Sequence, residues 1–144
     1  MLRRDYLLKL IQDLFAAISA LLDKDGDEVD KQRRIESLYT LFGANADFFR
    51  EASVADIVST VAQTAADGGG VPPDEVSKSE MEQRLELLAS LLYADFKVSN
   101  STSGLKADVA ERALELFLMV DKSSDTYSFE RLDKISELKA FLFR

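Results

Sequence analysis

The chain contains no cysteine, histidine or tryptophan and only two prolines. Without cysteine and histidine it has no thiolate or imidazole ligand for zinc, and it cannot form a Ser-His-Asp or Cys-His catalytic set. The Glu-x-x-His motif of di-iron helical bundles is excluded for the same reason. Any catalysis would have to use Asp, Glu, Lys, Tyr, Ser or Arg, and we predict no cofactor and no metal.

A long hydrophobic run is also missing. No stretch approaches the ~20 consecutive apolar residues of a membrane span. The apolar residues 14–22 follow Arg3 and Arg4, as in a signal peptide, but Lys9 and Asp13 interrupt the hydrophobic region. The acidic sequence DKDGDE then stands where a small-residue cleavage site would be. These features predict a cytoplasmic protein with no membrane partner.

Basic residues are fewer than acidic ones and do not cluster. The 144 residues include 26 acidic and 18 basic side chains, which gives a net charge of −8. The only basic doublets are at residues 3–4 and 33–34, and neutralising a phosphate backbone requires clustered lysine and arginine. The sequence therefore predicts no nucleic-acid partner.

Apolar residues recur at helical spacing, and no alternating strand pattern of useful length occurs. The pattern predicts one all-α domain over residues 1–144, without a sheet. Its helices are expected at about 2–23, 30–42, 53–66, 77–97, 105–120 and 128–143, with a short turn at 47–51. The segment 77–97 is apolar nearly all round, so we expect it to be the most buried helix.

Two loops have partial likenesses to ion-binding loops. The sequence DGGGVPPDEV at residues 67–76 is rich in glycine but lacks the Gly-Lys-Ser/Thr ending of a phosphate loop. The acidic turn after residue 22 begins like a calcium loop, but Gly26 is at position 4 instead of 6, and Arg34 replaces the bidentate Glu. We predict a flexible connection at 67–76 and a solvated turn at 24–29.

A basic and apolar pattern recurs three times at an interval of 50 residues. It reads RIESLYTLF at 34–42, RLELLASLL at 84–92 and KISELKAFL at 134–142. Ala-Asp-Phe follows the first copy at 46–48 and ends the helix of the second at 94–96. Such a period is typical of helical repeats. The pattern predicts two helical hairpins and a final unpaired helix.

The sequence ALELFLMV at 113–120 is similar to the second helix of a tetratricopeptide repeat, through its A-x3-F spacing. The opening RDYLLKLIQDL and the ending TYSFERLDKISELKAFL resemble an uncharacterised bacterial family of small all-helical proteins. The resemblance implies a divergent tetratricopeptide-like fold, with stacked helical hairpins in a right-handed superhelix. It implies no activity and no site residues.

The first functional hypothesis is a non-catalytic module that presents a groove to a protein or peptide partner. Repetition, an acidic surface and the lack of a catalytic set favour it. Aromatic side chains are common anchors at interfaces. The candidate exposed anchors are Tyr6, Phe15, Tyr93 and Tyr127.

Two alternatives remain open. A small-ligand binder or enzyme could use carboxylates spaced four residues apart on one helix face, provided that one of them is desolvated. Self-association through the first helix would explain why that helix is apolar over so much of its surface. The carboxylate pairs are Glu82/Glu86, Glu111/Glu115 and Asp133/Glu137.

Overall fold

The computed structural model describes residues 3–23, 26–98 and 104–143, and within them all side chains but those of residues 3–6, 28 and 104. These ranges form α-helices and two single-turn 3-10 helices, and contain no β-strand, as the sequence predicts. The elements in chain order are α1 (Arg3–Leu21), α2 (Glu28–Tyr39), η1 (Thr40–Phe42), α3 (Ala46–Glu51), α4 (Val54–Gly69), η2 (Pro73–Glu75), α5 (Lys78–Val98), α6 (Gly104–Ser123) and α7 (Phe129–Leu142).

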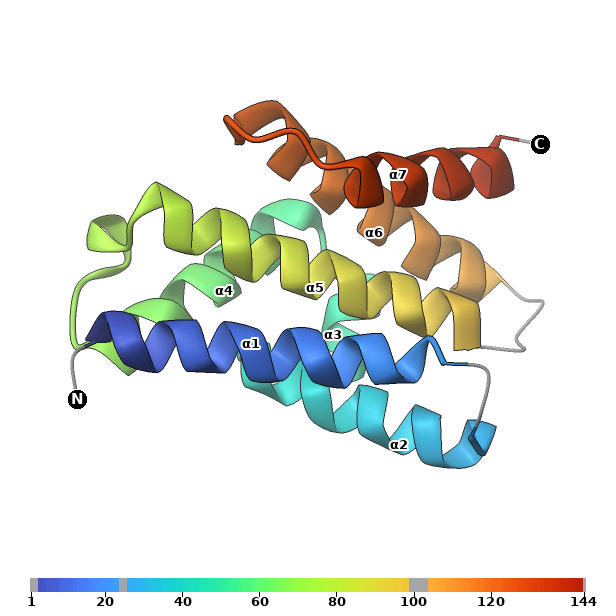
Figure 1. The fold of residues 1–144 in the computed structure, drawn as a ribbon, viewed down its shortest axis with the longest axis horizontal. Helices are drawn as coiled ribbons and strands as arrows, with labels where there is room; N and C mark the ends of the chain where they lie inside the picture. Colours follow the sequence, from blue (N-terminus) through green and yellow to red (C-terminus); the bar gives the residue numbers. More distant parts are fainter. Residues whose placement is uncertain (1–2, 24–25, 99–103, 144) are drawn as a thin grey trace.

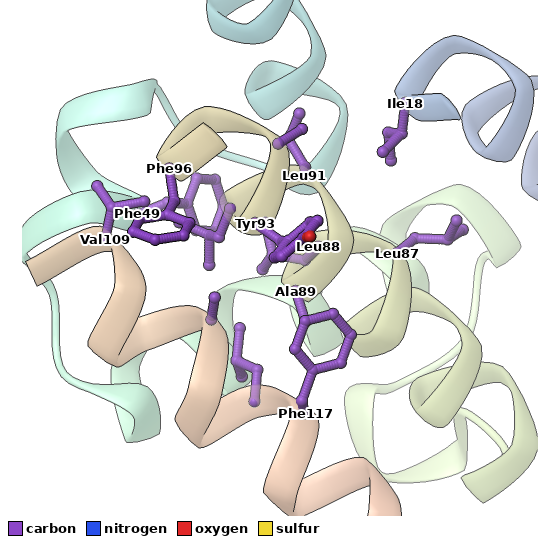
Figure 2. Packing of buried hydrophobic residues seen from close by; sticks show 14 of the residues in the cluster. Ile18, Phe49, Leu87, Leu88, Ala89, Leu91, Tyr93, Phe96, Val109 and Phe117 are labelled. Carbon is purple, nitrogen blue, oxygen red and sulfur yellow. The ribbon is translucent and has the colours of Figure 1, made fainter. Parts of the chain in front are cut away.

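Helix α5 is the centre of the fold. It contacts α1, α2, α4 and α6, and it runs between α1 and α7 in Figure 1. Twelve of its 21 residues are buried, more than in any other described helix. In Figure 2 its side chains lie among Ile18 of α1, Phe49 of α3 and Phe117 of α6. The prediction of a most buried helix at 77–97 is confirmed, because apolar residues on all sides of a helix require neighbours on all sides.

Several helices are capped at their N-terminus by a polar side chain that accepts a backbone hydrogen bond. The Asn45 side chain accepts a hydrogen bond from the Phe48 N–H at 2.9 Å, so residues 46–51 form the short helix α3 where a turn was expected. Ser53 caps α4 and Ser128 caps α7 in the same way. Each cap satisfies one of the backbone donors that have no partner inside the helix. Helix starts are therefore encoded locally.

Helix α4 continues further than the sequence suggests. Gly68 and Gly69 are helical, and the helix ends at Gly70, whose φ is 66°. The prediction that the glycine run breaks the helix from residue 67 is wrong. Glycine weakens a helix by only about 1 kcal/mol per residue, and the N–H groups of Gly70 and Val71 bond back to the Ala66 carbonyl. The flexibility of the connection stays a prediction.

The predicted hairpin arrangement is only partly right. Helices α5 and α6 pack along each other, and α7 packs on α6. The final helix is therefore not unpaired, since Ile135 and Leu138 bury its inner face. Helix α2 makes its most extensive helix contact with α5. The likeness to tetratricopeptide repeats stays a prediction.

Gly43 ends η1 with a φ of 111°, a conformation that L side chains rarely adopt. A Cβ there would lie 2.1 Å from the Thr64 hydroxyl oxygen. We expect Gly43→Ala to lower the free energy of unfolding by about 1–3 kcal/mol, because the backbone is strained and Thr64 is displaced.

Gly68→Ala is the matched control. Gly68 is helical, and a Cβ there meets no atom within 4 Å. This change is expected to raise the free energy of unfolding by about 0.4–1 kcal/mol. Urea unfolding of both variants checks the pair. If Gly43→Ala were as stable as the parent, the positive φ assigned to residue 43 would be contradicted.

Candidate binding groove

An open groove of about 640 Å³ runs along α5 between α1 and α7. The two flanking helices lie on either side of α5 in Figure 1. Buried residues of α5 and α6 form the floor, and the connection between α6 and α7 contributes to the lining. The lining residues are Ile11 and Phe15 of α1; Lys78, Ser79, Glu82, Gln83, Glu86, Leu87 and Ser90 of α5; Phe117 and Val120 of α6; Ser124, Asp125, Thr126 and Ser128; and Glu130, Arg131 and Lys134 of α7.

The floor of the groove is largely apolar. Leu87, Phe117 and Val120 are buried, at 7%, 1% and 2% exposed, and show only their outer edges. Ile11 packs against the same core from α1. Phe15 is 57% exposed and forms the α1 edge of the groove. An apolar floor with polar walls is the usual composition of a binding pocket.

One wall is fixed by Arg131, which is 3% exposed. Its Nη1 donates to the Glu86 carboxylate at 2.7 Å, and its Nε donates to Asp121 at 3.0 Å. Its Nη2 donates to the Thr126 carbonyl at 2.8 Å. The guanidinium thus joins α5, the end of α6, the connection and α7. Because charge-assisted hydrogen bonds are strong and directional, this wall is held in place without a ligand.

Lys134 lies next to this wall over two aromatic rings. Its Nζ is 5.5 Å from the ring centre of Tyr93 and 5.9 Å from that of Phe117. Burial lowers the pKa of Lys134, and the negative charges of Glu130 and Glu86 oppose that change. A cation over aromatic faces is stabilised by the ring quadrupole. These contacts fix the Lys134 side chain beside the floor of the groove.

The four predicted aromatic anchors do not come together. Phe15 lines the groove, whereas Tyr127 is 70% exposed and stacks edge-to-face on Phe129 outside the groove. Tyr93 is only 8% exposed. Its expected exposure is wrong, because its hydroxyl donates to Glu137 at 2.8 Å across the α5–α7 contact. The side chain of Tyr6 lies outside the described residues.

The carboxylate pairs do not form a closed site. Glu82 and Glu86 both line the groove, but Glu82 pairs with Lys78 at 3.7 Å and Glu86 with Arg131. Glu111 and Glu115 are exposed on α6. Across the described residues no cluster of acidic groups could hold a metal ion, and no described helix is long and apolar enough to cross a bilayer.

Asp133 and Glu137 differ in their surroundings and do not form a paired site. Asp133 is exposed, and Glu137 accepts hydrogen bonds from Tyr93 and from Lys97 at 2.7 Å. Burial acts to raise the pKa of Glu137, but these two hydrogen bonds and the positive charge of Lys97 together hold it below its ordinary value. Glu137 is thus a structural acceptor between α5 and α7.

A second polar cluster is buried away from the groove. Asp95 of α5 accepts hydrogen bonds from Tyr39 of α2 and Arg50 of α3. A cavity of about 80 Å³ lies beside it, between Gln32 and Lys106, far smaller than the ~300 Å³ of the smallest usual ligand pockets. This cluster is not predicted from the sequence. The available signal was an aspartate, Asp95, inside the apolar sequence LLYADF.

Comparisons of the chain with protein-family models, with curated proteins and with solved structures find no significant match.

Proposed function

We propose that the chain is a non-catalytic interaction module, and that its groove between α1 and α7 binds an amphipathic helix of a partner protein. The observation that carries the proposal is an open groove with an apolar floor and a wall fixed by Arg131. Helix-in-groove binding uses this combination, with an apolar helix face on the floor and polar residues at the rim. Glu82 and Glu86, the predicted carboxylate pair that lines the groove, are both ion-paired, which favours binding over carboxylate catalysis.

The dimensions of the groove suit a short helix. The lining residues of α5 run from Lys78 to Ser90, a distance of about 18 Å at 1.5 Å per residue. That length accommodates about three helical turns. The floor would receive two or three apolar side chains at i, i+3 or i+4, and i+7.

The charges favour a basic partner. Asp125 and Glu130 are exposed at the groove, and no ion pair to them occurs among the described residues. The whole chain carries a net charge of −8, which attracts basic partners at long range and increases their association rate. We therefore propose an amphipathic helix with lysine or arginine beside its apolar stripe.

Ser90→Trp tests the proposal. Ser90 is half-buried in the floor, so an indole there fills the groove without removing a core side chain. Helical peptides with basic flanks, selected from a displayed library against the parent chain, are the probes. We expect Ser90→Trp to weaken their binding at least roughly tenfold, about 1.4 kcal/mol, in calorimetric or anisotropy titrations.

The control is Ser136→Trp, which places the same ring at an exposed position of α7 outside the groove. It is expected to leave the peptide affinity unchanged. Equal binding by the parent and Ser90→Trp would contradict the proposal. A selection that enriches no helical peptide would do so as well.

A further inference from the structure

Helix α1 carries an exposed apolar stripe that no part of the described chain covers. Leu8 is 55% exposed, Phe15 is 57% exposed, and Leu22, one residue past the helix end, is 37% exposed. They are spaced seven residues apart, so each lies two turns after the previous one, with a drift of only ~20°. The adjoining face of the helix packs into the core through Leu14 and Ile18.

The order of side chains in this stripe is the same in both directions. Phe15 is at the centre, with a leucine seven residues before it and another seven residues after it. If two copies of α1 cross antiparallel about a twofold axis at Phe15, each Leu8 meets the other Leu22, and the two Phe15 rings meet. A twofold interface requires a surface that is complementary to itself.

The charges beside the stripe favour the same direction. Lys9 directly follows Leu8 and Asp23 directly follows Leu22, and both are exposed, so they lie along the same edge of the stripe at its two ends. In an antiparallel pair the same edge of both copies meets, which brings each Lys9 to the other Asp23. In a parallel twofold pair the two edges would lie on opposite sides of the interface, and Lys9 would not meet the other Asp23.

We infer that a second copy of this chain covers the stripe, with the two α1 helices antiparallel and Phe15 on the twofold axis. Three side chains per copy are few compared with the ~800 Å² per partner of a standard interface. The dimer is therefore weak and depends on protein concentration. The inference goes beyond the proposed function. Phe15 also forms the α1 edge of the groove, but Ser90, which tests that function, is on α5, so Ser90→Trp leaves the stripe itself unchanged.

Cysteine cross-linking tests the orientation, because the chain has no cysteine of its own. Full-length Leu8→Cys and Leu22→Cys proteins that differ in mass are mixed and treated with a short thiol-reactive cross-linker. We expect the mixed pair to cross-link at least roughly tenfold more than either variant alone, because two copies of the same position are about 21 Å apart in the antiparallel pair.

Ser59→Cys, exposed on α4, gives the background level. Sedimentation of the cysteine-free parent is expected to show dimer at high micromolar concentration, and Phe15→Asp only monomer, with an unchanged helical circular dichroism spectrum. Predominant Leu8–Leu8 or Leu22–Leu22 products would overturn the antiparallel arrangement. Cross-linking no higher than that of Ser59→Cys would overturn self-association through α1.

Discussion

Replacing Asp95 with alanine is expected to lower the free energy of unfolding by about 3–5 kcal/mol, because it leaves the buried Arg50 guanidinium without its buried ion-pair partner. Asp95 is 2% exposed and Arg50 is 9% exposed. The carboxylate accepts from Nε and Nη2 of Arg50 at 2.8 and 3.2 Å, and from the Tyr39 hydroxyl at 2.7 Å. One side chain of α5 thus holds α2 and α3 in place.

Tyr39 makes the loss larger. Its ring is fully buried and stacks on Phe49 with ring centres 5.7 Å apart. Burial, and then the negative charge of Asp95, raise the pKa of Tyr39 well above its ordinary value, so the hydroxyl stays a donor. Without Asp95 this buried donor loses its acceptor, which costs about 1–3 kcal/mol when no water replaces it.

A double variant separates the unpaired charge from the lost packing. Arg50→Met with Asp95→Leu removes both charges and fills the space with apolar atoms. It is expected to be more stable than Asp95→Ala alone, since replacing both members of a buried ion pair is often neutral. Urea unfolding followed by circular dichroism gives the free energies for both proteins.

Asp47→Ala is the matched control, because Asp47 also faces Arg50 but its side chain is 83% exposed and 3.9 Å from Nη1. It should cost less than about 1 kcal/mol, as exposed ion pairs do. If Asp95→Ala were no more destabilising than Asp47→Ala, the buried pair would not be what holds α2 and α3 on α5.

Leu88→Ala is expected to cost about 2–5 kcal/mol, because it leaves a cavity in the middle of the core. Leu88 is completely buried on α5, and Figure 2 places it among side chains of the neighbouring helices. Those helices are held by their own contacts, with α6 packed on both α5 and α7. The core can therefore close only part of the cavity.

Leu118→Ala on α6 removes the same atoms from a side chain that is 39% exposed. Its cost should stay within about 1 kcal/mol, as for most substitutions at the surface. Urea unfolding measures both effects: a shift of the midpoint without a change in the dependence of the free energy on urea concentration reports a change in stability. Equal losses for the two variants would show that α5 is not the centre of the core.

The helices could be predicted from the sequence because their signals are local. Ser53 and Ser128 precede helices that they cap, Gly43 ends a helical segment, and apolar residues all round 77–97 indicate a buried helix. The end of α4 could not be predicted from the sequence. Its last turn is held by a backbone hydrogen bond from the Gly70 N–H to the Ala66 carbonyl, and no residue type in the glycine run indicates that bond.

The groove could not be predicted, because its parts are far apart in the chain. Ile11, Leu87 and Arg131 line it together although more than 40 residues separate each from the next. Aromatic residue type also does not decide exposure. Nothing in the sequence distinguishes Tyr93 from Tyr127. Tyr93 is buried between α5 and α7, whereas Tyr127 precedes α7 and is exposed to solvent. Packing between helices makes that difference.

The most direct test of the proposed groove is to map peptide binding by backbone amide chemical shifts. A selected basic amphipathic helix is titrated into the isotope-labelled chain. The groove predicts that the largest shifts occur at Ile11, Leu87, Ser90, Phe117 and Arg131, which line it from four helices. Shifts confined to α2 and α4, with those five amides unchanged, would contradict it.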